Sequence, residues 1–224
     1  MKTIDCFDGR YAFLSNFFET KIYYNGEVYS HAEGAFQAAK SLDPQLRKEF
    51  ALMLKSPGQA KRAGRGKPFK SSTGETLKLQ LRPDWEEVKD SVMYDIVYAK
   101  FSQNMELKQA LLLTGDAILI EGNYWHDNYW GNCSCERCAN RRGRNQLGKI
   151  LMQVRARLRY EDENPNLVYN KQQLLDLFIK EADMLEQRLV LVEETPNINQ
   201  SMLLARQPLP NGALDGPLKP PCSK

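Results

Sequence analysis

The chain has 224 residues, of which 42% are hydrophobic and 26% are charged, and its formal net charge is +3. This composition is that of an ordinary globular protein, and it excludes wholly disordered, collagen-like and membrane-spanning chains. Because the length exceeds the ~100–150 residues of a typical domain, we expect one globular domain with an appendage, or two small domains.

No segment reaches the roughly 20 apolar residues of a membrane-spanning helix, and the N-terminal sequence MKTIDCFDGR lacks the apolar run of a secretory signal. Three of the five cysteines crowd together at Cys133, Cys135 and Cys138, unlike the framework of a disulfide-rich secreted domain. We therefore expect a cytoplasmic protein with reduced thiols and no membrane contact.

The N-terminal part of the chain predicts a short strand, a hairpin and a helix. A strand is expected over residues 3–7, and the pair Asn25-Gly26 between β-forming residues is a strong hairpin signal. Ser30 then precedes apolar residues at helical spacing, and Glu33 is placed to complete a capping box with it. A helix should therefore follow the hairpin directly.

The middle of the chain is predicted to be mainly helical, with one buried strand and one long loop. The loop is rich in Gly, Asn, Trp and Cys, and loops of this length inside a domain usually bind something. Two short helices are expected to begin at Pro44 and at Pro57, and the second should end at the glycines Gly64 and Gly66. Longer apolar patterns predict helices over residues 84–99, 107–113 and 147–158. The buried strand is expected at 117–120 and the loop at 122–144.

The distribution of charge divides the chain near residue 160. Residues 55–70 carry six basic side chains and residues 137–159 carry eight, and neither stretch contains an acidic residue. Residues 161–194 instead carry nine carboxylates against three basic side chains. We predict a domain over 1–160, an acidic helical extension over 161–194 with a helix from Asn170 to Leu189, and a proline-rich flexible tail over 195–224.

Glu33 lies in the first turn of its predicted helix, and Gln37 and Lys40 follow it on the same face. One carboxylate and one amine on a polar face can take part in catalysis. The alternative is a capping glutamate on a solvated face.

Within the long loop, the run WHDNYW places Asp127 between Trp125 and Trp130. Such tryptophans can present a flat face to a base or a sugar, and a carboxylate between them can bind hydroxyls. The alternative is that these aromatic residues pin the loop to the core. The spacing of Trp85 places it on the apolar face of its own helix.

Three thiols in CxCxxC and His126, seven residues before Cys133, supply the donor types of a tetrahedral zinc site. A second CxxC pair is missing, so the alternative is three reduced thiols in a surface loop. We assign no metal and no cofactor from the sequence.

Six short motifs occur along the chain: FLSNFF (13–18), AEGAFQAAK (32–40), AGR (63–65), DWEEVKDSVM with AKF (84–101), EGNYWHDNYWG (121–131) and GRNQLGKILMQVR (143–155). Their sequences and order resemble the NADAR superfamily, whose members include N-glycosidases of riboflavin intermediates and hydrolases that remove ADP-ribose from guanine. The resemblance covers about residues 4–159, and the chain departs from the family at Gly34, where an aromatic residue is usual, and in the cysteine-bearing insert.

The resemblance implies a predominantly helical α+β domain with a small antiparallel sheet and one pocket for a ribosyl nucleotide. It also implies catalytic roles in that pocket for Glu33, Lys40 and Asp127. The substrate-binding residues that it suggests are Ser15, Asn16, Phe17, Arg65, Trp85, Trp125, Trp130, Gly131 and Asn145.

Cleavage of an N-glycosidic bond builds positive charge on the ribose C1. A carboxylate such as Glu33 can stabilise this charge, or the same carboxylate can activate the attacking water. A partly neutral lysine can instead attack C1 and form a Schiff base, and Lys40 is the candidate, with Lys89 and Lys100 behind it.

We expect an N-glycosidase, and its favoured substrate is ADP-ribosylated guanine in nucleic acid, because the basic stretches exceed what one phosphate requires. The alternatives are a phosphoribosylamino-pyrimidine of the riboflavin pathway as substrate, a non-catalytic module that binds ADP-ribose or nucleic acid, and a zinc-stabilised interaction domain.

Overall fold

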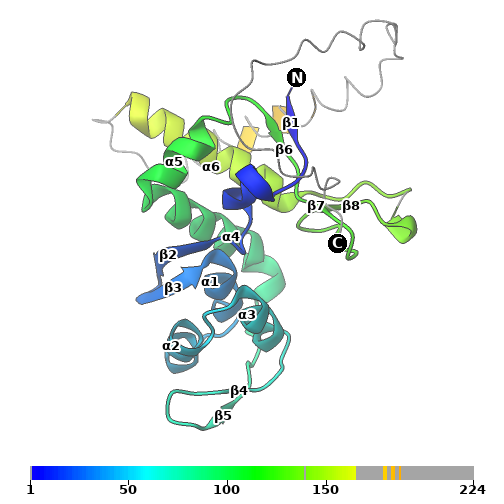
Figure 1. Ribbon diagram of the computed structural model, residues 1–224. Coiled ribbons are helices and arrows are strands. Elements are labelled where there is room, and N and C mark those ends of the chain that lie inside the picture. Colours follow the sequence, from blue (N-terminus) through cyan, green and yellow to red (C-terminus); the bar gives the residue numbers. More distant parts are fainter. Residues whose placement is uncertain (1, 139, 165–178, 181–182, 185–186, 188–224) are drawn as a thin grey trace, which may run out of the picture.

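The structure is a computed structural model that describes residues 2–138, 140–164, 179–180, 183–184 and 187. Helices dominate it (Figure 1), which confirms the predicted helical α+β class. They are η1 (Gly9–Leu14), α1 (Ala32–Ala38), α2 (Pro44–Met53), α3 (Pro57–Gly64), α4 (Trp85–Ser102), α5 (Met105–Leu112), η2 (Glu136–Cys138) and α6 (Gln146–Glu163).

In the described part of the chain, the strands form four small sheets of two strands each, two of them antiparallel and two parallel. The predicted hairpin is present as β2 (Glu19–Tyr24) and β3 (Glu27–His31), and both residues of its turn, Asn25 and Gly26, have positive φ. The other pairs are β1 (Thr3–Ile4) with β6 (Ile118–Leu119) and β7 (Gly122–Asn123) with β8 (Asn132–Cys133), both parallel, and β4 (Phe69–Lys70) with β5 (Thr76–Leu77), antiparallel.

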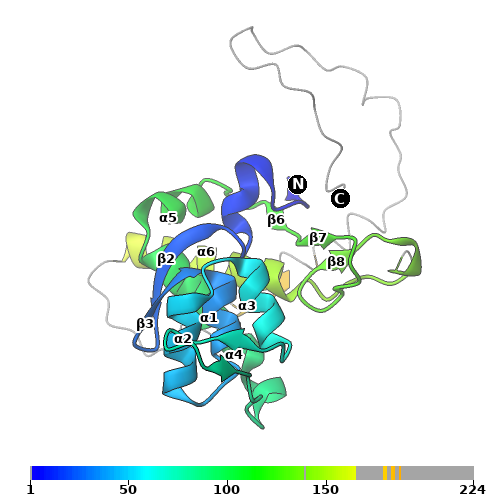
Figure 2. The ribbon, with the colours of Figure 1, turned by 60° about the horizontal axis from the view of Figure 1, so that its bottom comes forward.

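Helix α4 is the centre of the molecule. It packs against α1 on one side and against α5 and α6 on another, and the hairpin β2–β3 lies beside it (Figures 1 and 2). Its residues Ile96, Val97 and Phe101 are fully buried, as the spacing of apolar residues requires for a helix covered on several sides. The arrangement leaves the N-terminal ends of α1 and α4 to frame a site.

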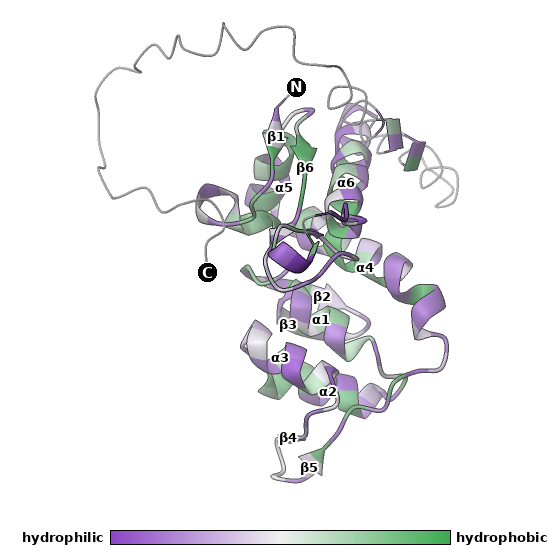
Figure 3. Ribbon diagram, turned by 90° about the vertical axis from the view of Figure 1, so that its right-hand side faces the viewer, coloured by the Kyte–Doolittle hydropathy of each residue, from purple (hydrophilic) through white to green (hydrophobic). Residues whose placement is uncertain are grey.

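Hydropathy follows the packing, as Figure 3 shows. Strand β6 is hydrophobic, and its Ile118 and Leu119 are fully buried. Among the described residues, no helix is long and apolar enough to cross a membrane.

The N-terminus of α1 differs from the prediction. The N-cap is His31, whose Nδ1 accepts the backbone N–H of Gly34 at 2.7 Å, and Ser30 is not the cap. A Cβ at position 34 would lie 2.9 Å from Cε1 of His31. Gly34, the departure from the family pattern, therefore makes room for a buried imidazole that caps the helix.

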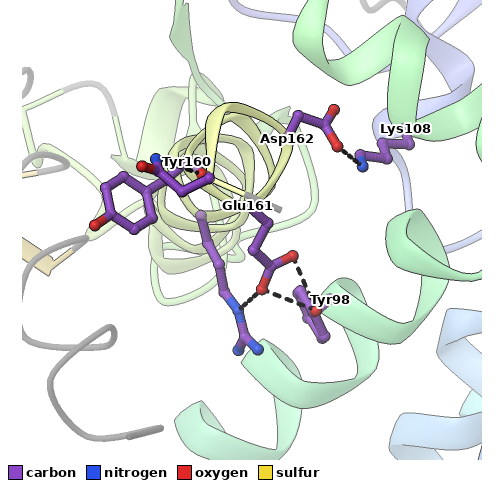
Figure 4. Close-up of polar contacts among 7 residues, drawn as sticks. Tyr98, Lys108, Tyr160, Glu161 and Asp162 are labelled. Atoms are coloured by element: carbon purple, nitrogen blue, oxygen red, sulfur yellow. Dashed lines mark hydrogen bonds and ion pairs between the residues drawn. The ribbon is translucent and has the colours of Figure 1, made fainter. Parts of the chain in front are cut away.

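Helix α6 runs to Glu163, past the boundary expected at residue 160. Its last turn ties α4 and α5 to it, as Figure 4 shows: the hydroxyl of Tyr98 donates to Glu161 at 3.0 Å, and Asp162 pairs with Lys108. The three-part division of the chain stays a prediction. The helix expected over 170–189 lies mostly, and the tail over 195–224 wholly, outside the described residues.

The thiols of Cys133, Cys135 and Cys138 are free, as predicted. Cys6 is disulfide-bonded, so the expectation of reduced thiols is wrong for that residue.

Candidate active site

A cavity of about 790 Å³ opens between α1, α3, α4 and the loop that follows β6. Ten of the twelve predicted site residues line it, although they come from five separate segments of the chain. These ten are Ser15, Asn16, Phe17, Glu33, Lys40, Arg65, Trp85, Trp125, Asp127 and Trp130.

Glu33 is buried at 7% exposure, so the alternative of a solvated polar face on α1 is wrong. Its backbone N–H donates to the carbonyl of Asn16 at 3.0 Å, and its Oε1 accepts Nε2 of Gln37 at 2.8 Å. Burial raises the pKa of Glu33, while Gln37 and the charges of Lys61 and Lys40 oppose that rise. A carboxyl in this setting can hold a proton or carry a charge, depending on what lies beside it.

The three candidate lysines differ in the hydrogen-bond and ion-pair partners of their side-chain amino groups. Nζ of Lys40 donates to the carbonyl of Gly64 at 3.3 Å, and burial lowers the pKa of Lys40. Lys89 also lines the cavity, but its ion pair with Glu86 raises its pKa, and its Nζ lies 4.0 Å from the ring centre of Tyr129. A carboxylate partner keeps an amine protonated, so Lys89 is the poorer nucleophile.

Lys100 is fully buried and does not line the cavity. Its Nζ donates to the carbonyls of Phe13 at 2.6 Å and Ser15 at 2.8 Å, so it holds the segment that carries Asn16. Burial lowers the pKa of Lys100 to about 7. Its position makes it a structural anchor, and Lys40 is the lysine whose environment fits a nucleophile.

An aromatic wall forms one side of the cavity. Phe36 packs between Trp85 and Trp130, with ring centres 5.1 and 5.3 Å apart. Trp85 thus belongs to the core, as its spacing predicts, and to the cavity, as the resemblance implies. Phe17 and Trp125 are 45% and 59% exposed and lie at the cavity, where they can stack on a planar base.

The carboxylate of Asp127 is engaged by its own loop. Its Oδ1 accepts the backbone N–H of Tyr129 at 3.2 Å and of Trp130 at 2.9 Å, and Asn123 donates to its carbonyl at 2.7 Å. Asp127 lines the cavity and also shapes the turn that presents Trp130.

Gly131 and Asn145 do not line the cavity, contrary to the expectation of substrate contact. A Cβ on Gly131 would lie 2.2 Å from the carbonyl oxygen of Glu121. Asn145 accepts the backbone N–H of Glu121 at 3.0 Å through Oδ1 and donates to Leu119 at 2.9 Å. Both residues position Glu121.

Glu121 is the residue that the sequence analysis missed. It lines the cavity, and burial raises its pKa to about 7, with the charge of Asp127 adding to the effect. It opens the EGNYW motif directly after a buried strand, which is a common place for a functional carboxyl. No spacing pattern marked it, because the Asn145 and Gly131 contacts that fix it come from distant segments.

Three buried polar atoms at the cavity make no hydrogen bond within the described part of the chain: Oδ1 of Asn16, Oε1 of Gln37 and Oε2 of Glu121. Buried acceptors without partners are costly unless a ligand satisfies them. Oδ1 of Asn16 and Oε2 of Glu121 are therefore candidate attachment points for a molecule with hydroxyl or amine donors, whereas Oε1 of Gln37 faces Gly64 of α3.

The chain matches the NADAR domain over residues 6–159. It belongs to this family. N-glycosidase YbiA of Escherichia coli strain K12 is 36% identical over 67% of this chain and 84% of the relative. Riboflavin biosynthesis protein VVA0006 of Vibrio vulnificus is 34% identical over 75% of this chain and 40% of the relative.

The solved structure of E. coli YbiA resembles the fold with a TM-score of 0.55 at 32% identity, and the match covers 76% of this chain and 93% of that one. These comparisons confirm the predicted family and the prediction of an enzyme of the N-glycosidase class. The choice of substrate and the roles of the individual residues stay predictions.

Proposed function

We propose that the NADAR-family chain hydrolyses the N-glycosidic bond that joins ADP-ribose to a guanine base in nucleic acid. The observation that carries the proposal is one cavity that combines two carboxyls of raised pKa, Glu33 and Glu121, with Lys40, whose pKa is lowered. Titratable groups whose pKa values are displaced toward neutrality are suited to proton transfer and nucleophilic attack.

In the proposed reaction, the unprotonated amine of Lys40 attacks C1 of the ribose and the C1–N bond breaks. The electron pair of that bond goes to the departing base, which takes a proton from a neutral carboxyl; Glu121, with a pKa of about 7, is the suitable donor. The carboxylate of Glu33 stabilises the positive charge on C1. A proton passes from the attached nitrogen to the ring oxygen as the sugar ring opens to a protonated Schiff base on Lys40. Water then adds to C1, ADP-ribose is released and the amine of Lys40 is restored.

The size and charge of the cavity favour the larger substrate. About 790 Å³ lies in the upper part of the ~300–1,000 Å³ range of ligand sites, more than one pyrimidine nucleotide needs. Lys61, Arg65 and Lys89 line the cavity beside Lys40 and can meet a diphosphate. Beyond it, the guanidinium of Arg144 lies 5.3 Å from the ring centre of Tyr129, where a continuing phosphate backbone can reach it.

The alternative substrate is a phosphoribosylamino-pyrimidine. It is supported by the relatives, because riboflavin biosynthesis is named for the Vibrio vulnificus protein and for a chloroplastic protein of Zea mays. The two substrates share the same bond chemistry and differ in the phosphates beyond the ribose.

The test measures released product from ADP-ribosylated DNA, ADP-ribosylated RNA and the phosphoribosylamino-pyrimidine. The triple variant Arg141→Ala, Arg142→Ala and Arg144→Ala is compared with wild type, and Lys48→Ala on α2 is the control for lost charge. We expect the triple variant to bind oligonucleotide weakly, with a salt slope flatter by about 0.7–0.9 per lost contact, and still to cleave a free ADP-ribosylated nucleoside.

Turnover of the pyrimidine alone, with little salt dependence for oligonucleotides, would replace the proposed substrate by the alternative. Binding of all substrates without any product would instead support a module that holds ADP-ribose without catalysis.

A further inference from the structure

The side chains of His126, Cys133, Cys135 and Cys138 gather at one point of the loop between β6 and α6. Each offers one ligand atom, and these four atoms all lie within 4.8 Å of one another. Nδ1 of His126 lies 3.0 Å from Sγ of Cys135 and 3.6 Å from Sγ of Cys138. The backbone N–H of His126 lies against Sγ of Cys133 at 3.3 Å.

We propose that these four residues bind one Zn²⁺ ion, with Nδ1 of His126 and three thiolates as ligands. Ligand atoms around a tetrahedral zinc with bonds of about 2.3 Å to sulfur and about 2.0 Å to nitrogen lie roughly 3.4–3.8 Å apart. The two distances from Nδ1 of His126, 3.0 and 3.6 Å, lie near this range, and all four atoms lie within 4.8 Å of one another. Soft thiolates with one imidazole favour zinc over hard cations such as Mg²⁺ and Ca²⁺. Binding releases three thiol protons and changes no oxidation state.

The backbone supports this geometry at two places. His126 has φ +67°, a left-handed conformation that costs a non-glycine residue free energy and persists where its surroundings hold it. The 3-10 turn η2 brings Cys138 back toward Cys135, and its N–H donates to the carbonyl of Cys135 at 2.8 Å. Cys133 belongs to β8, which pairs with β7. Three local structures thus converge on one point.

The site acts on the cavity through the loop. His126 and Cys133 bracket the turn that carries Asp127, Tyr129 and Trp130, all of which line the cavity. A bound ion would fix both ends of this turn, so the proposed zinc is structural and its four protein ligands leave no open position for catalysis. It holds one wall of the cavity in place.

Metal content of the full chain, purified without chelators, tests the proposal. We expect one zinc per chain and, after exchange with Co²⁺, the visible absorption bands of a tetrahedral thiolate site. Cys135→Ser should lower zinc retention against a competing chelator at least about tenfold. Ser134→Ala, an exposed neighbour on the same loop, is the matched control and should retain one zinc.

A second measurement needs only the wild-type chain, in case a variant fails to fold. Bound zinc should protect Cys133, Cys135 and Cys138 from alkylation in mass spectrometry, and removal of the metal should expose all three thiols. Zinc at a small fraction of one per chain, alkylation unaffected by the metal, or a disulfide between two of these cysteines in the purified chain would each overturn the proposal. These readouts do not depend on turnover, so the zinc site and the proposed function can fail separately.

Discussion

Replacement of Gly64 by alanine tests whether the contact between α1 and α3 holds Glu33, the proposed catalytic carboxyl, in place. A Cβ at position 64 would lie 1.8 Å from Oε1 of Gln37, 2.6 Å from its Cδ and 2.9 Å from its Cβ. Because the Cβ of Gln37 is fixed to the α1 backbone, a new rotamer cannot relieve the whole clash. Gln37 or the helix must move by more than an ångström, and Gln37 is the donor to Glu33.

The expected change in the free energy of unfolding is the sum of two opposing effects, overpacking and helix propensity. Overpacking of this kind destabilises by about 1–3 kcal/mol, and the better helix propensity of alanine offsets up to about 1 kcal/mol. Gly58 on the same helix is the matched control, because a Cβ there meets only Oγ of Ser56 at 3.8 Å. Gly58→Ala should be neutral or stabilising. The two variants should therefore differ by about 2 kcal/mol, or roughly 4–8 °C in Tm.

Thermal melting and product release measure the two consequences. A displacement of about 1 Å at the site costs on the order of 100-fold in rate, so Gly64→Ala should lose turnover while Gly58→Ala keeps it. A Gly64→Ala variant that melts no lower than Gly58→Ala and turns over normally would refute the argument, since Gln37 would then have room to move without effect on Glu33.

Three further substitutions address the titratable groups. Glu33→Gln should abolish turnover with unchanged circular dichroism, because the amide keeps an acceptor for Gln37 and loses the charge; near-normal turnover would leave Glu33 a structural role. Lys40→Arg should abolish the protein–sugar adduct that borohydride traps during turnover, whereas Lys89→Arg should keep it; an adduct that persists in Lys40→Arg contradicts the assignment. The pKa of Glu121 is raised to about 7 by burial, so the folded state binds more protons than the unfolded state between about pH 4.5 and 7, and its stability falls as pH rises through that window. Glu121→Gln, which mimics the neutral form, should therefore match wild type in Tm at pH 5 and exceed it at pH 8, and equal melting at both values would contradict the shift.

The helices and the hairpin were predictable because local sequence determines them. Asn25-Gly26 specifies the turn by its positive φ angles, and Asp43-Pro44 begins α2 with a side chain that accepts the N–H of Gln45 at 2.9 Å. The strands of β1 and β6 were predicted, but their parallel pairing was not, because it joins residues more than 100 positions apart and leaves no local pattern. The pair β7–β8 was not predicted either, because two residues per strand are too few to show a periodicity.

The cap of α1 shows why a local rule can fail by one residue. Ser30 and Glu33 have the spacing of a capping box, but Glu33 turns into the cavity and bonds to Gln37. The buried ring of His31 takes the capping role, which requires Gly34 to lack a side chain. Because Glu33 is buried at the cavity, it does not form the capping box that the local sequence predicts.

In the candidate site, too, some residues could be predicted from local sequence motifs and others depend on the tertiary fold. Glu33 lies on α1 and Lys40 lies in the turn just past the end of that helix, and both line the cavity, as the family-like motif predicts. Glu121 acquires its raised pKa from burial and from the charges of Asp127 and Glu33, which the folded chain brings together. Asn145 has the left-handed φ of +51° and uses its amide to hold the backbone of Glu121, so it acts on the site without touching the cavity. Asn145 should therefore affect a reaction by orienting Glu121. A variant of Asn145 should change the pH dependence of Tm between about pH 4.5 and 7, the range in which Glu121→Gln also changes it.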